Sequence, residues 1–163
     1  MDFSEPFRRC GVVRFSPDGS KLALLDRDKV VVRDPDTLEV LCVRGLSEEG
    51  TGTSLQWSAC SRRLLCALPK SAVCLAWQVV HDDSAKPWQC RIDEGLAGLS
   101  FCRWGPHGHH LLTICDFALR LTLWSLRSRQ VRFIERPKFA NGRGVVFSPN
   151  GMSLAVLHRR EGK

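Results

Sequence analysis

Two stretches of this 163-residue chain decide its fold: Phe15-Ser-Pro-Asp-Gly-Ser-Lys-Leu-Ala-Leu-Leu25 and Phe147-Ser-Pro-Asn-Gly-Met-Ser-Leu-Ala-Val-Leu157. Each has an aromatic residue, a turn, two mostly polar residues and then an apolar run. Proline presets φ at the second turn position, and glycine accepts a positive φ at the fourth. This chemistry predicts a tight hairpin between two antiparallel strands.

Two more stretches follow the same pattern, Trp57–Ala67 and Trp104–Ile114. The stretch from Trp104 keeps the proline and glycine of the turn, whereas the one from Trp57 has lost both. The leading aromatics recur at intervals of 42, 47 and 43 residues. Such a period is typical of the blades of a WD40 propeller, which repeat every ~40–45 residues.

A second landmark lies 20 residues after two of these aromatics, at Trp77 and Trp124. In a WD40 blade a Trp-Asp dipeptide ends the third strand here, but this chain has Trp-Gln and Trp-Ser, and the partner Gly-His dipeptide is missing. We therefore expect the buried polar network of a standard blade to be absent. We interpret the recurring aromatics as structural positions, the tryptophans packing between blades. These positions are Phe15, Trp57, Trp77, Trp104, Trp124 and Phe147.

The pattern predicts an all-β chain, a partial WD40-type β-propeller of about three and a half four-stranded antiparallel blades. We expect a single incomplete propeller over residues 1–163, with blades at 8–45, 53–94 and 97–137 and a partial blade at 142–160. We see no convincing helix. Closed propellers need roughly four to eight blades, so we expect the N-terminal part of a longer protein or a truncated isoform. Alone, this incomplete propeller would expose an unpaired strand edge, which favours poor solubility or assembly with other chains.

Charge and composition narrow the possible partners. The net charge is +7, but residues 1–118 hold 14 basic and 15 acidic residues, whereas residues 119–163 hold 10 and 2. The basic end is either a face for acidic partners or a set of solvated strand edges. The apolar runs are far shorter than the ~20 residues of a membrane span, so we expect no membrane partner.

We expect no enzymatic activity, cofactor or metal. The sequence has no phosphate-binding loop, nucleophile elbow or zinc-protease motif. The eight cysteines show no C-x-x-C spacing and are interpreted as small buried residues. The less favoured alternative is a zinc site at Cys102, His107, His109 and Cys115, whose spacing fits no standard zinc pattern.

Several stretches carry a more specific resemblance. The chain opens with Met-Asp-Phe-Ser-Glu-Pro-Phe, and its centre reads Trp88-Gln-Cys-Arg-Ile-Asp-Glu-Gly95, then Ala97-Gly-Leu99 and Leu119-Arg-Leu-Thr-Leu-Trp-Ser-Leu126. In this order of motifs the chain resembles the N-terminal part of a centrosomal and spindle-pole family of WD-repeat proteins. The resemblance runs from residue 1 to about residue 160.

This resemblance implies a role and no reaction. Members of the family are scaffolds that support spindle assembly, anchoring of microtubule minus ends and formation of primary cilia. The implied partners are a coiled-coil spindle-pole anchoring protein of the SSX-two-interacting type and microtubule-associated proteins. The implied location is the cytoplasm and cytoskeleton, at the centrosome (microtubule-organising centre) and spindle pole.

We expect any partner surface among charged residues at strand ends and loops. Asp93 and Glu94 follow a predicted strand and precede a glycine, a pattern that turn chemistry or a partner contact would explain. The basic stretch near the C-terminal end is the second part of this surface. Its residues are Arg127, Arg129, Arg132, Arg136, Lys138 and Arg143. The alternative is a nucleic-acid-associated WD40 protein using these cations on phosphates, with Phe133 and Phe139 as its only interleaved aromatics.

Overall fold

In the computed structural model, fourteen strands account for most of the described chain, which comprises residues 11–26, 28–46, 50–80, 87–118, 120–135 and 144–156. The first sheet holds β1 (Val12–Phe15), β2 (Leu22–Asp26), β3 (Lys29–Arg33) and β4 (Val40–Gly45). The second holds β5 (Ser54–Trp57), β6 (Arg63–Leu68), β7 (Val73–Gln78) and β8 (Gln89–Asp93). The third holds β9 (Phe101–Trp104), β10 (His110–Ile114), β11 (Arg120–Ser125) and β12 (Gln130–Glu135). The two-stranded fourth holds β13 (Val145–Phe147) and β14 (Leu154–Val156).

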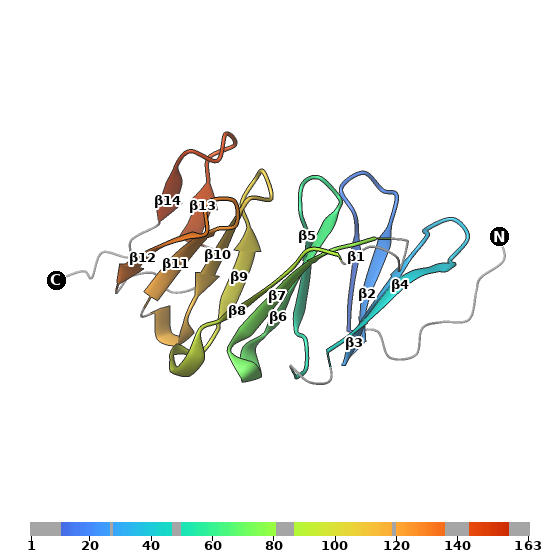
Figure 1. The fold of residues 1–163 in the computed structure, drawn as a ribbon, viewed down its shortest axis with the longest axis horizontal. Helices are drawn as coiled ribbons and strands as arrows, with labels where there is room; N and C mark the ends of the chain where they lie inside the picture. Colours follow the sequence, from blue (N-terminus) through green and yellow to red (C-terminus); the bar gives the residue numbers. More distant parts are fainter. Residues whose placement is uncertain are drawn as a thin grey trace.

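Each sheet is an antiparallel meander, because every strand pairs only with its neighbours in the chain. The sheets stand side by side in chain order, from the blue strands of the first to the red strands of the last (Figure 1). Within the described ranges, three single-turn 3-10 helices lie between strands: η1 (Pro69–Ser71), η2 (Gly95–Ala97) and η3 (Asp116–Ala118). No helix of the described residues is long and apolar enough to cross a membrane. We call the four sheets blades one to four.

The hydrophobic core lies between blades. One cluster joins Val30 and Val32 of blade one to Leu64 and Trp77 of blade two. A second cluster joins blade two to blade three around Trp104, and a third joins blade three to Val145 of blade four. A sheet that is apolar on both faces has to be covered on both, and a neighbouring blade on each side does this.

The hairpin turns between the first two strands show the predicted chemistry. In blade one the Ser16 hydroxyl donates to Asp18, and the backbone N–H of Lys21 donates to the Ser16 hydroxyl. The turn that starts at Ser148 in blade four repeats both contacts with its own residues. Gly19 has φ 74°, and Ser61 takes the same left-handed conformation with φ 57° in the blade that lacks the glycine. The turn survives there because the Ser58 hydroxyl accepts a hydrogen bond from the Arg63 N–H, as Ser16 and Ser148 do in the turns of blades one and four.

The predicted fold is confirmed: the described chain has three four-stranded antiparallel sheets and half of a fourth. The tryptophans pack between blades as expected, with Trp57 and Trp77 in the first cluster and Trp104 in the second. Trp124 packs against the second cluster and is only partly buried. Phe15 occupies the equivalent repeat position but is 63% exposed, because no described blade precedes blade one.

Candidate interaction surface

Asp93 and Glu94, adjacent in sequence, have different environments. Asp93 ends β8 and is exposed; its carboxylate accepts a hydrogen bond from the Gly95 N–H (2.8 Å) and pairs with Arg91 (2.9 Å). These two donors lower the pKa of Asp93. Turn chemistry, the first of the two interpretations of this pair, therefore accounts for Asp93.

Glu94 is not part of an exposed surface, and the prediction that placed it there is wrong. Its side chain is 1% exposed. The carboxylate accepts a hydrogen bond from the Thr113 hydroxyl and is paired with the Arg120 guanidinium (2.6 Å). A buried carboxylate needs such partners, because leaving it unpaired would cost several kcal/mol. Glu94 thus has a packing role that the sequence analysis did not recognise.

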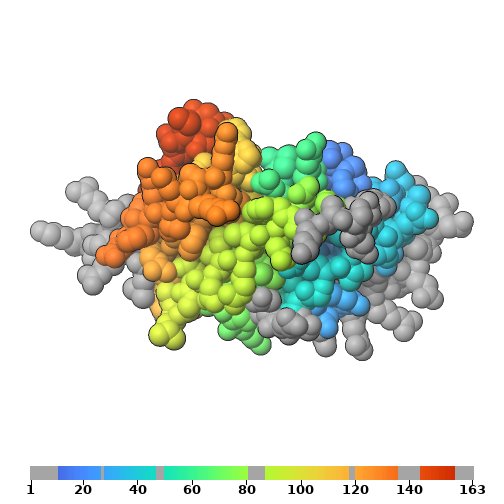
Figure 2. All heavy atoms as spheres, viewed as in Figure 1, coloured from blue at the N-terminus to red at the C-terminus, as the bar shows by residue number. Residues whose placement is uncertain are grey.

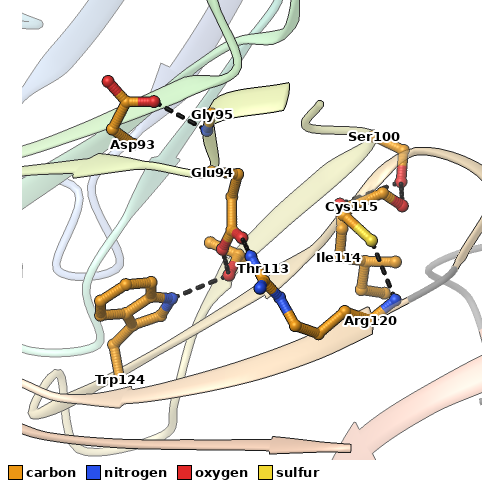
Figure 3. A network of polar contacts seen from close by, with 9 residues as sticks. All are labelled: Asp93, Glu94, Gly95, Ser100, Thr113, Ile114, Cys115, Arg120 and Trp124. Atoms are coloured by element: carbon orange, nitrogen blue, oxygen red, sulfur yellow. Dashed lines mark hydrogen bonds and ion pairs between the residues drawn. The ribbon is translucent and has the colours of Figure 1, made fainter. Parts of the chain in front are cut away.

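These contacts form a buried polar network in blade three (Figure 3). Trp124 Nε1 donates to Thr113 Oγ1 (2.8 Å), and Thr113 in turn donates to Glu94. The hydrogen bond from the Arg120 guanidinium to the Glu94 carboxylate raises the pKa of Arg120. The expectation that the blades lack such a network is therefore wrong for blade three, where Glu94 completes it without a Gly-His or Trp-Asp dipeptide.

The sequence contained one signal for this network. Thr113 is the polar member of the otherwise apolar run Leu-Leu-Thr-Ile, and it is fully buried. A buried hydroxyl requires a hydrogen-bond partner, so it indicates a polar neighbour. Arg120 and Trp124 share a face of β11 opposite Leu121 and Leu123, a placement that alternation along the strand predicts.

The described part of the basic stretch is exposed. Arg127 and Arg129 lie in the turn between β11 and β12, and Arg132 lies on β12. All six residues of β12 are exposed, including Phe133 at 60%. Arg136, Lys138 and Arg143 lie outside the described residues. The segment that carries the three described arginines, orange in Figure 2, forms part of the face in view.

The outer edge of blade three therefore combines cations with exposed apolar side chains. We define the blade-three edge as Arg127, Arg129, Val131, Arg132, Phe133 and Ile134. Val131 and Ile134 are 46% and 48% exposed. An exposed apolar strand beside several cations is a feature of surfaces that bind a partner with apolar and acidic groups.

The candidate zinc ligands do not converge. Cys102 is buried in β9, and Cys115 lies beyond β10, where its sulfur accepts a hydrogen bond from the Arg120 N–H (2.9 Å). His107 lies in a turn and pairs through Nε2 with the Asn150 carbonyl oxygen of blade four (3.0 Å). Within the described ranges no group of three or more His, Cys, Asp or Glu side chains could hold a metal ion.

Comparison with known proteins gives a curated relative at high coverage of this chain. The chain is 37% identical over 166 aligned residues to the mouse (Mus musculus) WD repeat-containing protein WRAP73; the alignment covers 99% of this chain and 34% of WRAP73. The chain thus spans about a third of the length of this relative. No protein-family model matches the chain.

Solved structures show the same fold. The chain resembles the β-propeller domain of Cps50 (Swd1) from Myceliophteria thermophila with a TM-score of 0.65 and 23% identity, covering 90% of this chain and 48% of that one. It also resembles the WD40 repeats of RRP9 with a TM-score of 0.66 and 12% identity, covering 95% of this chain and 52% of that one. The repeated hairpins, the blades and these structural likenesses agree, so the chain has the fold of a partial WD40-type β-propeller.

Proposed function

We propose that this chain is a non-enzymatic interaction scaffold of the centrosome and spindle pole. The observation that carries the proposal is the 37% identity to WRAP73 over 99% of the chain. The proposed location and process rest on the resemblance of its motifs to the centrosomal WD-repeat family, whose members support spindle assembly, anchoring of microtubule minus ends and ciliogenesis. WD40 propellers generally serve as scaffolds, because their rigid blades present variable loops and edges to partners.

The partner in this proposal is a coiled-coil spindle-pole protein of the SSX-two-interacting type, with microtubule-associated proteins as further members of the complex. The blade-three edge is the surface that suits it best. Its arginines would meet the acidic positions of a helix, while Val131 and Phe133 would meet the apolar ones.

A pull-down from mitotic extract, read by mass spectrometry, tests the proposal. We expect the tagged chain to recover spindle-pole coiled-coil proteins, and Arg129→Glu/Arg132→Glu to reduce this recovery at least about tenfold. The matched control is Arg62→Glu/Lys70→Glu, which reverses two exposed charges of blade two. It should leave the recovery unchanged.

Two results would overturn the proposal. Recovery of chaperonin alone would show that this chain does not act as a scaffold. Salt-dependent recovery of RNA, abolished by the same Arg129 and Arg132 substitutions, would favour the nucleic-acid alternative.

A further inference from the structure

The first strands of the blades carry a row of equivalent side chains. Arg14, Gln56 and Arg103 each precede the leading aromatic of their blade, on β1, β5 and β9. Hydrogen bonds between blades fix this order, because Trp57 Nε1 donates to the Arg14 carbonyl (3.0 Å) and Trp104 Nε1 donates to the Gln56 carbonyl (3.2 Å). Gln56 therefore lies between the two arginines.

These side chains line a hollow on the inner strands. One cavity of about 650 Å³ is lined by Arg14, Gln56, Arg103 and Val146 among others. A second cavity, of about 320 Å³, shares Gln56, Arg103 and Val146 with the first. The two cavities are thus parts of one depression, which we call the inner-strand trough.

The trough has positive charge and no negative charge among its described lining residues. Its only charged side chains there are Arg14 and Arg103. The Arg14 guanidinium donates to the Val13 carbonyl (2.8 Å), and the Arg103 guanidinium makes a long contact with the Val145 carbonyl (3.4 Å). A guanidinium has five N–H donors, so each arginine keeps donors for a ligand. Neither is paired with a carboxylate of the described chain.

The spacing of the charges indicates the form of the ligand. The two arginines are separated by a whole strand, β5, so one compact anion is a poorer match than two carboxylates held apart. The planar guanidinium of arginine can donate two parallel hydrogen bonds to one carboxylate. Thr53 and Ser54 add exposed hydroxyls to the lining, which can bond a peptide backbone.

Nucleic acid fits the trough less well. Proteins that bind a phosphate backbone tightly do so through many contacts with cations, on the order of six to ten in strongly salt-dependent cases. The described trough offers two. An extended acidic peptide needs no more than two cations, because contacts with apolar surface and backbone hydrogen bonds supply the rest of the binding free energy.

We propose that the inner-strand trough binds an extended acidic peptide segment, with Arg14 and Arg103 each holding one carboxylate. This inference goes beyond the scaffold proposal and does not depend on it, because it concerns the inner strands and not the blade-three edge. The segment is defined by its chemistry: glutamate or aspartate side chains on one face of an extended chain.

Fluorescence anisotropy tests this with a labelled peptide of alternating glutamate and serine, and with the same peptide carrying glutamine for glutamate. We expect only the glutamate peptide to bind. Arg14→Ala and Arg103→Ala should each raise its Kd about tenfold, and the double variant about a hundredfold. The control Lys29→Ala/Arg62→Ala removes two exposed charges that line neither cavity and should change the Kd less than about twofold.

Each other result decides against the trough. Equal binding of the glutamine peptide would exclude recognition of carboxylates, and equal loss in the control variant would show attraction by net charge alone. Tighter binding of oligothymidylate, lost on the same Arg14 and Arg103 substitutions, would assign the trough to nucleic acid. If circular dichroism shows that an alanine variant is unfolded, Arg14→Lys and Arg103→Lys replace it. They keep the charge, lose the fork and should still raise the Kd about threefold.

Discussion

At the scale of single residues, the buried Glu94 connects the segment between β8 and β9 to two strands of blade three. It lies between β8 and β9, 19 residues before Thr113 on β10 and 26 before Arg120 on β11. Thr113 is the middle of the network, since its hydroxyl accepts from Trp124 and donates to Glu94. Without this hydroxyl, Trp124 and Glu94 each lose a hydrogen-bond partner. Leaving a buried polar group without its partner costs more free energy of unfolding than losing a hydrogen bond at an exposed position.

Thr113→Val removes the hydroxyl while keeping the shape of the side chain. We expect the free energy of unfolding to fall by about 1–3 kcal/mol, because the Trp124 N–H and the Glu94 carboxylate each lose a partner. Urea denaturation measures this. Thr122→Val is the matched control: Thr122 lies opposite Thr113 in the β10–β11 register, is equally buried, and is outside the network. An equal loss in both variants would contradict the role given to the network.

At the scale of elements, the hairpin turn of blade one is held by one carboxylate. Asp18 accepts hydrogen bonds from the Ser16 hydroxyl (2.6 Å) and from the Ser20 N–H (3.0 Å) and hydroxyl (2.8 Å). These donors favour the ionised form and hold the pKa of Asp18 well below its usual value of 3.8. The backbone N–H of Asp18 also donates to the Ser61 hydroxyl of blade two (3.1 Å), so this turn also supports the contact between blades.

Acidification should therefore destabilise the chain through this turn. The folded state holds the ionised Asp18 better than the unfolded state does, so the stabilisation is complete above the usual pKa of 3.8 and is lost as the pH falls below it. Asp18→Asn should lower the melting temperature at neutral pH and flatten its decline between about pH 5 and about pH 2. Part of the decline should remain, because the pKa of Asp93 is also lowered. Asp36→Asn, in an exposed turn of the same blade, should keep the full decline; an Asp18→Asn variant that also kept it would contradict the prediction.

Local features explain which elements could be predicted. The turns and strands follow from residues that are close in the chain: serine, proline and glycine at fixed positions before an apolar run. The Glu94 network and the inner-strand trough were missed because their members come together only when strands of different hairpins or blades pack. Gln56 shows this limit of prediction. Alternation along β5 predicts the face on which its side chain lies, but it does not predict that the Trp104 indole of the next blade donates to the Gln56 backbone carbonyl.

At the scale of the whole molecule, blades two, three and four each pack a leading aromatic residue against the core that they share with the blade before them. Trp57 and Trp104 are buried and donate their indole N–H groups to carbonyls of the preceding first strand. Phe147 continues the series in blade four and packs against the third cluster, although it has no ring N–H. Phe15 stands at the same place in blade one, where no described blade covers it.

Replacement of the leading aromatic by alanine should therefore lower the free energy of unfolding by different amounts in blades three and one. Trp104→Ala should lower the free energy of unfolding by about 3–5 kcal/mol, because it empties a site that is 4% exposed and removes a hydrogen bond between blades. Phe15→Ala should change it by no more than about 0.5 kcal/mol, because the ring is mainly in solvent. Urea denaturation of both variants gives the comparison. Trp104→Phe, which mainly removes the indole N–H, should cost about 1 kcal/mol and serves if the alanine variant does not fold. An equal cost for Phe15→Ala and Trp104→Ala would mean that the first strand of blade one is covered in solution, and that the blade-to-blade packing continues past Phe15.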